Sequence, residues 1–90
     1  MEEKFIAACA DARQKAGALG IRIRPVTDMK QAHQILSGHR ESDGFGALAA
    51  KGRLDLSLEA LAVKKGFTNL FTDEEAKNAL MRLLDAGYKF

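Results

Sequence analysis

Hydrophobic residues recur along this chain at helical spacing, and glycines or polar stretches separate the repeats. In the first segment the apolar positions follow one another at intervals of four and three residues, which places them on one face of a helix. These residues are Phe5, Cys9, Ala12, Ala16 and Leu19. Gly20 stands where a glycine commonly ends a helix. The pattern therefore predicts a helix over residues 3–19 with a narrow, alanine-rich inner face.

Start and stop signals coincide with the helical period near the end of the chain. Thr72 and Glu75 have the spacing of a capping box, in which each side chain bonds the backbone N–H of the other residue. Gly87 is expected to end this helix at about residue 86, with Tyr88 folding back in a Schellman motif. The pattern assigns four apolar residues to one side of the helix. They are Ala76, Leu80, Leu83 and Leu84.

Three shorter helices are expected between these two. Asp28 opens one that ends at Ser37 and Gly38, since Asp28 and Gln31 also have capping-box spacing. Residues 45–52 give a turn or two of helix closed by Gly52. Another helix starts at Asp55 or Ser57 and ends before Gly66. The inward residues expected of these helices are Met29, Ala32, Ile35, Leu36, Phe45, Leu48, Ala49, Leu58, Leu61 and Ala62.

Two stretches lack the helical period. IRIRPV alternates apolar and basic residues from Ile21, but Pro25 cannot donate to a strand ladder and no second alternation exists to pair with it. An extended connector near 21–26 is favoured, with a strand formed only in a dimer as the alternative. HRESDG, residues 39–44, is a polar loop and the segment expected to be most mobile.

These elements predict an all-α fold, a small orthogonal bundle of four to five helices with one short extended segment. Ninety residues form a single domain, 1–90, because chains divide into separate cores only at greater length. The composition is 47% hydrophobic and 29% charged, which is typical of a folded domain and excludes intrinsic disorder.

The charge is nearly balanced. Fourteen basic and twelve acidic residues give a net charge of +2 at pH 7, with no basic arm or acidic tail. The single cysteine excludes an internal disulfide and favours a reducing cytoplasm. Charges interrupt the apolar residues at the N-terminus, so neither a signal peptide nor a membrane span is expected there.

No constellation with the spacing of a catalytic or metal site is evident. The neighbours of Cys9 are alanines and offer no base. His33 and His39 are six residues apart, whereas helical ligand pairs are three or four apart. His39, Ser42 and Asp43 contain the atoms of a catalytic triad, but they share one polar loop. We therefore expect no enzyme, no cofactor, no metal and no small-molecule substrate.

The stretch SLEALAVKKGFT, residues 57–68, resembles the helix–turn segment of arabinose-regulator-type transcription factors. The closing LMRLLDAGYKF resembles the recognition helix of winged-helix proteins. The resemblance implies a helix-turn-helix-like DNA-binding domain over 57–86. The candidate phosphate contacts are Lys51, Arg53, Lys64 and Lys65. Against this interpretation, the first turn of the reading helix carries Asp73, Glu74 and Glu75, which would repel phosphates.

The leading hypothesis is a non-enzymatic helical module that binds another protein, or itself as a homodimer. Apolar residues near the C-terminal end outnumber what the expected core needs. These candidate protein contacts are Phe67, Leu70, Phe71, Tyr88 and Phe90. If they stay partly exposed, they mark a contact surface, since monomers rarely expose large apolar patches without a function.

Overall fold

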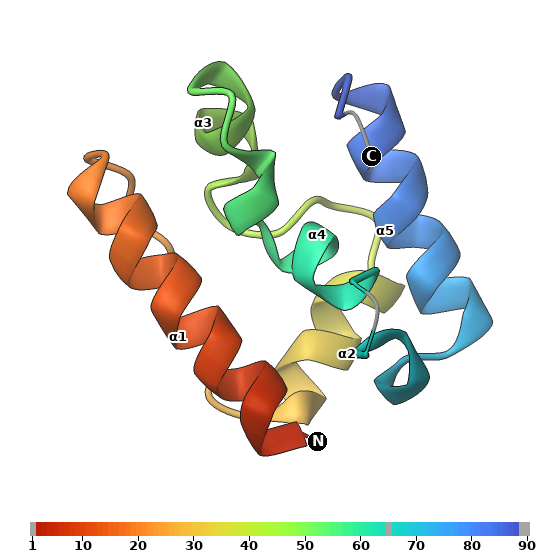
Figure 1. Cartoon of the computed structure of the whole chain (residues 1–90). Helices are drawn as coiled ribbons and strands as arrows, with labels where there is room; N and C mark the ends of the chain where they lie inside the picture. The colour runs from red at the N-terminus through yellow and green to blue at the C-terminus, as the bar shows by residue number, and fades with distance from the viewer. Residues whose placement is uncertain (1, 65, 89–90) are drawn as a thin grey trace.

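The computed structural model describes residues 2–64 and 66–88. Within these ranges the chain forms five α-helices, two 3₁₀-helices and no strand (Figure 1). The elements are α1 (Glu2–Ala18), α2 (Met29–Ser37), α3 (Phe45–Ala50), η1 (Leu54–Leu56), α4 (Leu58–Ala62), η2 (Thr68–Leu70) and α5 (Asp73–Asp85). The predicted small all-α bundle is confirmed, and residues 21–27 form a connector without regular structure. Two predicted contact residues, Lys65 and Phe90, lie outside the described residues.

The ends of α5 form as its sequence signals predict. The Thr72 hydroxyl accepts the Glu75 N–H at 3.1 Å, and the Glu75 carboxylate accepts the Thr72 N–H at 2.9 Å. At the other end the Gly87 N–H donates to the Leu84 carbonyl and the Tyr88 N–H donates to the Leu83 carbonyl, the two bonds of a Schellman motif. Gly87 has φ +82°, a conformation that favours glycine.

The short helix α4 lies in the middle of the molecule. It packs against α5 on one side and against α1 on the other, and α2 also packs against α5. Figure 1 shows α1 and α5 as the two outer columns, with α2 crossing below and α3 at the top. Ser57 starts α4, because its hydroxyl accepts the Ala60 N–H at 3.1 Å. The arrangement leaves one long side of α5 without a neighbouring helix.

Phe5 joins the start of α1 to the segment before α5. Its ring is fully buried and meets Phe67 and Phe71 edge to face, with centroids 5.3 and 5.0 Å apart. Leu36, Leu48 and Leu83 are likewise fully buried, from α2, α3 and α5. A single apolar core therefore connects α1, α2, α3 and α5.

Residues 42–44 of the 39–44 loop contact the connector and α4, which the sequence pattern did not predict. The Glu59 carboxylate accepts hydrogen bonds from the Ser42 N–H at 2.8 Å and the Ser42 hydroxyl at 2.5 Å. The Arg24 N–H donates to Asp43 at 2.8 Å. Gly44, at φ +78°, approaches the connector so closely that a Cβ would lie 2.8 Å from Ile23 Cγ1. Polar bonds and a glycine contact together hold the loop against the connector and α4.

The prediction of which side of α5 is buried is wrong: the buried side is rotated about the helix axis from the predicted one. The buried residues are Glu75, Ala79 and Leu83. Leu80 and Leu84, expected beside Leu83, are exposed instead. The buried stripe passes through a small alanine, because α5 packs closely on α2 and α4. The bulkier leucines on the adjacent side are left outside.

No helix of the described chain is both long and apolar enough to span a bilayer.

Candidate functional site

The predicted apolar contact residues that fall within the described ranges lie at the edge of the core. Phe71 is buried, while Phe67, Leu70 and Tyr88 are half-buried and pack against the core cluster. Phe90 is outside the described residues. Much of their apolar surface is therefore already used within the chain, which makes them a smaller contact surface than the sequence suggested.

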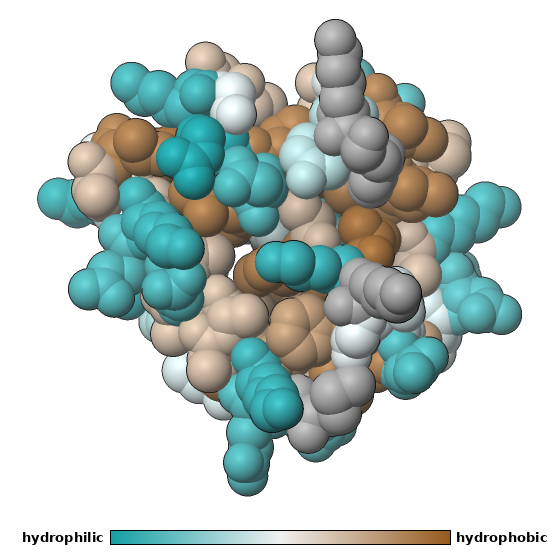
Figure 2. Space-filling view, in the orientation of Figure 1, coloured by the Kyte–Doolittle hydropathy of each residue, from teal (hydrophilic) through white to brown (hydrophobic). Residues whose placement is uncertain are grey.

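The exposed large hydrophobic side chains of the described chain lie on α5. Leu80 is 39% exposed, Met81 49% and Leu84 51%. We call these three residues, with the exposed Lys77 one turn before Met81, the outer α5 face. Figure 2 shows hydrophobic atoms gathered at the upper right, where α5 lies in Figure 1. These side chains point away from the buried stripe, so this apolar surface is available to another molecule.

Polar side chains on the inner side of α5 fix its position. The Arg82 guanidinium donates to the Gly38 carbonyl at 2.7 Å and the Ile35 carbonyl at 3.2 Å, and Asn78 donates to the Leu36 carbonyl at 3.0 Å. These carbonyls at the end of α2 would otherwise lack helical partners. The outer α5 face is consequently presented on a helix that is capped at both ends and anchored to α2.

Arg82 also forms a buried ion pair with Glu59. The two side chains approach to 3.3 Å and are 11% and 0% exposed. Glu59 thus receives bonds from Arg82 and Ser42, which ties α4, α5 and the 39–44 loop together. Sequence reasoning missed this cluster. The available signal was a charged residue inside each of two apolar stretches, LEALA and LMRLL.

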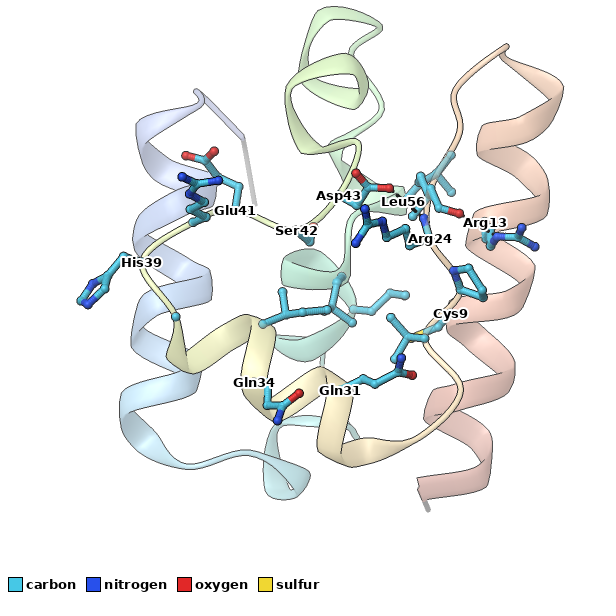
Figure 3. Close-up of a pocket in the computed structure, with 18 residues that line it drawn as sticks. Cys9, Arg13, Arg24, Gln31, Gln34, His39, Glu41, Ser42, Asp43 and Leu56 are labelled. Atoms are coloured by element: carbon cyan, nitrogen blue, oxygen red, sulfur yellow. Dashed lines mark hydrogen bonds between the residues drawn. The ribbon is translucent and has the colours of Figure 1, made fainter.

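A second surface feature is an open groove of about 760 Å³ beside α2 (Figure 3). Its walls are the 23–26 connector and the 38–43 loop. Apolar residues from α1, the connector, α2, η1 and α4 form much of its lining, and they include Cys9, Ile23, Val26, Ile35, Leu56, Leu58 and Leu61. The polar residues around it are Arg13, Arg24, Gln31, Gln34, His39, Arg40, Glu41, Ser42 and Asp43. The volume would admit a small ligand or a few side chains of a peptide.

The groove does not assemble the triad atoms found in its loop. The Ser42 hydroxyl donates a hydrogen bond to the Glu59 carboxylate, and Asp43 accepts one from the Arg24 N–H. Figure 3 shows His39 pointing away from the groove. Burial raises the pKa of the Cys9 thiol to about 11, so this thiol stays protonated at neutral pH and is a poor nucleophile. Among the described residues no group of three or more metal-ligating side chains comes together.

The candidate phosphate-binding residues do not form one patch in the described chain. Lys51 and Lys64 are exposed at the ends of α3 and α4, which lie at different heights in Figure 1. Arg53 is paired with Asp55 at 3.1 Å. The hydrogen bond from Arg53 holds the pKa of Asp55 below its ordinary value. Lys65 lies outside the described residues.

No protein-family model matches this chain, and no solved structure matches it at a significant level.

Proposed function

We propose that this chain is a non-enzymatic helical module that binds another protein, or a second copy of itself, through the outer α5 face. The observation that carries the proposal is the exposure of Leu80, Met81 and Leu84 on one anchored helix. Large apolar side chains gathered on one surface commonly mark a contact site. Covering each of these half-exposed side chains would contribute roughly 1 kcal/mol to binding. A reducing cytoplasm is the proposed location, since the single cysteine is buried and unpaired.

The rigidity of α5 favours binding without rearrangement. Its capping box, its Schellman motif and the bonds from Arg82 and Asn78 fix the helix before any partner arrives. A surface ordered in advance loses less conformational entropy on association. The outer α5 face therefore fits the role of a preformed docking helix.

The charges on α5 favour a protein partner over DNA. A DNA-reading helix presents basic or amide side chains at its N-terminal turn. The first turn of α5 instead presents Asp73 and Glu74 to solvent. The following exposed turns carry Leu80, Met81 and Leu84, which cannot hydrogen-bond base edges.

Site-specific photo-crosslinking in cells of the source organism tests the proposal. A photoreactive residue in place of Met81 is expected to give protein adducts. The same residue in place of Gln14, exposed on α1, is the matched control and should give few. Equal adducts from both positions, or none from Met81, would contradict the proposal.

Titration into random-sequence DNA tests the helix-turn-helix alternative. Binding driven by phosphate contacts weakens steeply as salt rises, because counterions are released. We expect no binding at low salt. Tight binding at low salt that is lost with added salt and with Lys51→Glu would favour the DNA-binding hypothesis.

A further inference from the structure

The charges beside the outer α5 face are complementary to those of an antiparallel copy of the same helix. Building on the proposed function, we propose that the partner is a second copy of this chain. The two α5 helices would pack antiparallel across a two-fold axis that passes near Met81.

Two-fold symmetry fixes which residues meet. In such an interface one residue of the first copy contacts another in the second copy, and the reverse contact is identical. With the axis at Met81, each Met81 faces its own copy. Lys77 and Asp85, four residues to either side, then lie at the same level of opposite helices. The two levels are separated by about 12 Å, or eight residues at the rise of an α-helix.

The charges at these levels are complementary. Lys77 and Asp85 are both exposed, and neither has an ion-pair partner among the described residues. Antiparallel packing would pair Lys77 with Asp85 at each end of the contact. Parallel packing would place Lys77 against Lys77 and Asp85 against Asp85, and like charges in contact disfavour the wrong arrangement. The charge pattern thus selects one orientation.

The apolar spacing is also suitable for helix pairing. Lys77, Met81 and Leu84 follow at intervals of four and three residues on α5, as in the seam between two packed helices. Leu80 borders this line and would widen the contact. The seam is short, and contacts smaller than about 1,200 Å² are usually weak. We therefore expect a weak dimer, with a dissociation constant of roughly 1 μM or above.

Charge reversal measured by sedimentation equilibrium tests the proposal. The wild-type chain should dimerise as its concentration rises. Lys77→Glu alone and Asp85→Lys alone should each weaken dimerisation at least about fivefold. The double variant K77E/D85K should restore it, since the pair is re-formed with its signs exchanged. Lys30→Glu, an exposed residue on α2 with the same change in charge, is the control and should leave dimerisation unchanged.

The outcomes separate this inference from the function on which it rests. The proposed antiparallel register is overturned if both single variants dimerise as tightly as the wild type. It is also overturned if the double variant does not recover wild-type dimerisation. A chain that stays monomeric to millimolar concentration overturns self-pairing. In that case, crosslinks in cells from position 81 to a different protein would still support protein binding through the outer α5 face. If no crosslink forms, both the proposed function and the proposed dimer are contradicted. Circular dichroism confirms that each variant is folded, as expected for changes at exposed positions.

Discussion

Glu59 carries a carboxylate into the centre of the molecule, where an unpaired charge would be very costly. It is tolerated because Ser42 donates two hydrogen bonds and Arg82 supplies the opposite charge. Arg82 in turn bonds two carbonyls at the end of α2. One residue of a five-residue helix thereby sets the positions of the 39–44 loop and of α5.

Removing this carboxylate should destabilise the fold strongly. Glu59→Ala leaves the Arg82 charge buried without its partner, so the free energy of unfolding should fall by about 3–5 kcal/mol. Urea denaturation measures it, with Glu59→Gln as a milder variant if the alanine variant is largely unfolded. The matched control, Asp55→Ala, breaks an exposed pair and should cost less than about 1 kcal/mol. Similar losses for Glu59→Ala and Asp55→Ala would contradict the role given to Glu59.

Glu75 makes stability depend on pH in the acid range. Burial acts to raise its pKa, but hydrogen bonds from the Thr72 N–H and from His33, together with the charge on His33, lower the pKa below its ordinary value of 4.5. A carboxyl with a lowered pKa in the folded state stabilises the fold above its ordinary pKa. That contribution is lost as pH falls through the lowered pKa.

Glu75→Gln tests this linkage because the amide keeps the shape of the side chain without its charge. The wild type should be more stable than the variant at about pH 6, and the difference should shrink towards about pH 3 as Glu75 becomes protonated. Urea midpoints at the two pH values provide the comparison. A difference that stays constant, or grows on acidification, would show that the charge of Glu75 does not stabilise the fold.

At the scale of the element, two glycines at the end of α1 have opposite roles. Gly20 has φ +83° and ends the helix, with the Ile21 N–H donating to the Ala16 carbonyl as in the Schellman motif after α5. Gly17 lies inside α1, has no positive φ and leaves open space where a Cβ would stand. Only Gly20 needs the conformational freedom of glycine.

The same substitution should therefore change stability in opposite directions at these positions. Gly17→Ala is expected to raise the free energy of unfolding by about 0.5–1 kcal/mol, because alanine favours a helix. Gly20→Ala should lower it by about 1 kcal/mol, since a left-handed conformation is strained for alanine. Thermal unfolding followed by circular dichroism measures both. Equal shifts in the same direction would mean that the helix end does not depend on Gly20.

The helices also show what could be predicted from this sequence. The ends of α5 were predictable because capping and Schellman motifs are local, and Thr72, Glu75 and Gly87 form them within a few residues. The side that α5 buries was not. Its apolar residues span a wide arc, and the stripe passing through Ala79 is selected by packing on α2 and α4. The candidate site therefore could not be found from residue type alone, since Leu83 and Leu84 look equivalent in the sequence.

In the whole molecule, the groove beside α2 and the outer α5 face differ in the side chains that surround them. The groove is lined by Cys9, Ile35 and Leu58 together with many polar side chains. The outer α5 face lies on the outside of the bundle and carries Leu80, Met81 and Leu84 exposed. Because an exposed apolar helix face can contact a symmetric copy of itself, this placement favours the outer α5 face as the contact surface.

Methyl NMR spectra recorded over a concentration series show whether the outer α5 face contacts a second copy of the chain. The methyl signals of Leu80, Met81 and Leu84 should move together as the protein concentration rises towards millimolar, while those of buried Leu48 and Leu36 stay fixed. Unchanged signals on α5 throughout the series, or shifts confined to the groove-lining residues such as Leu58, would contradict this contact.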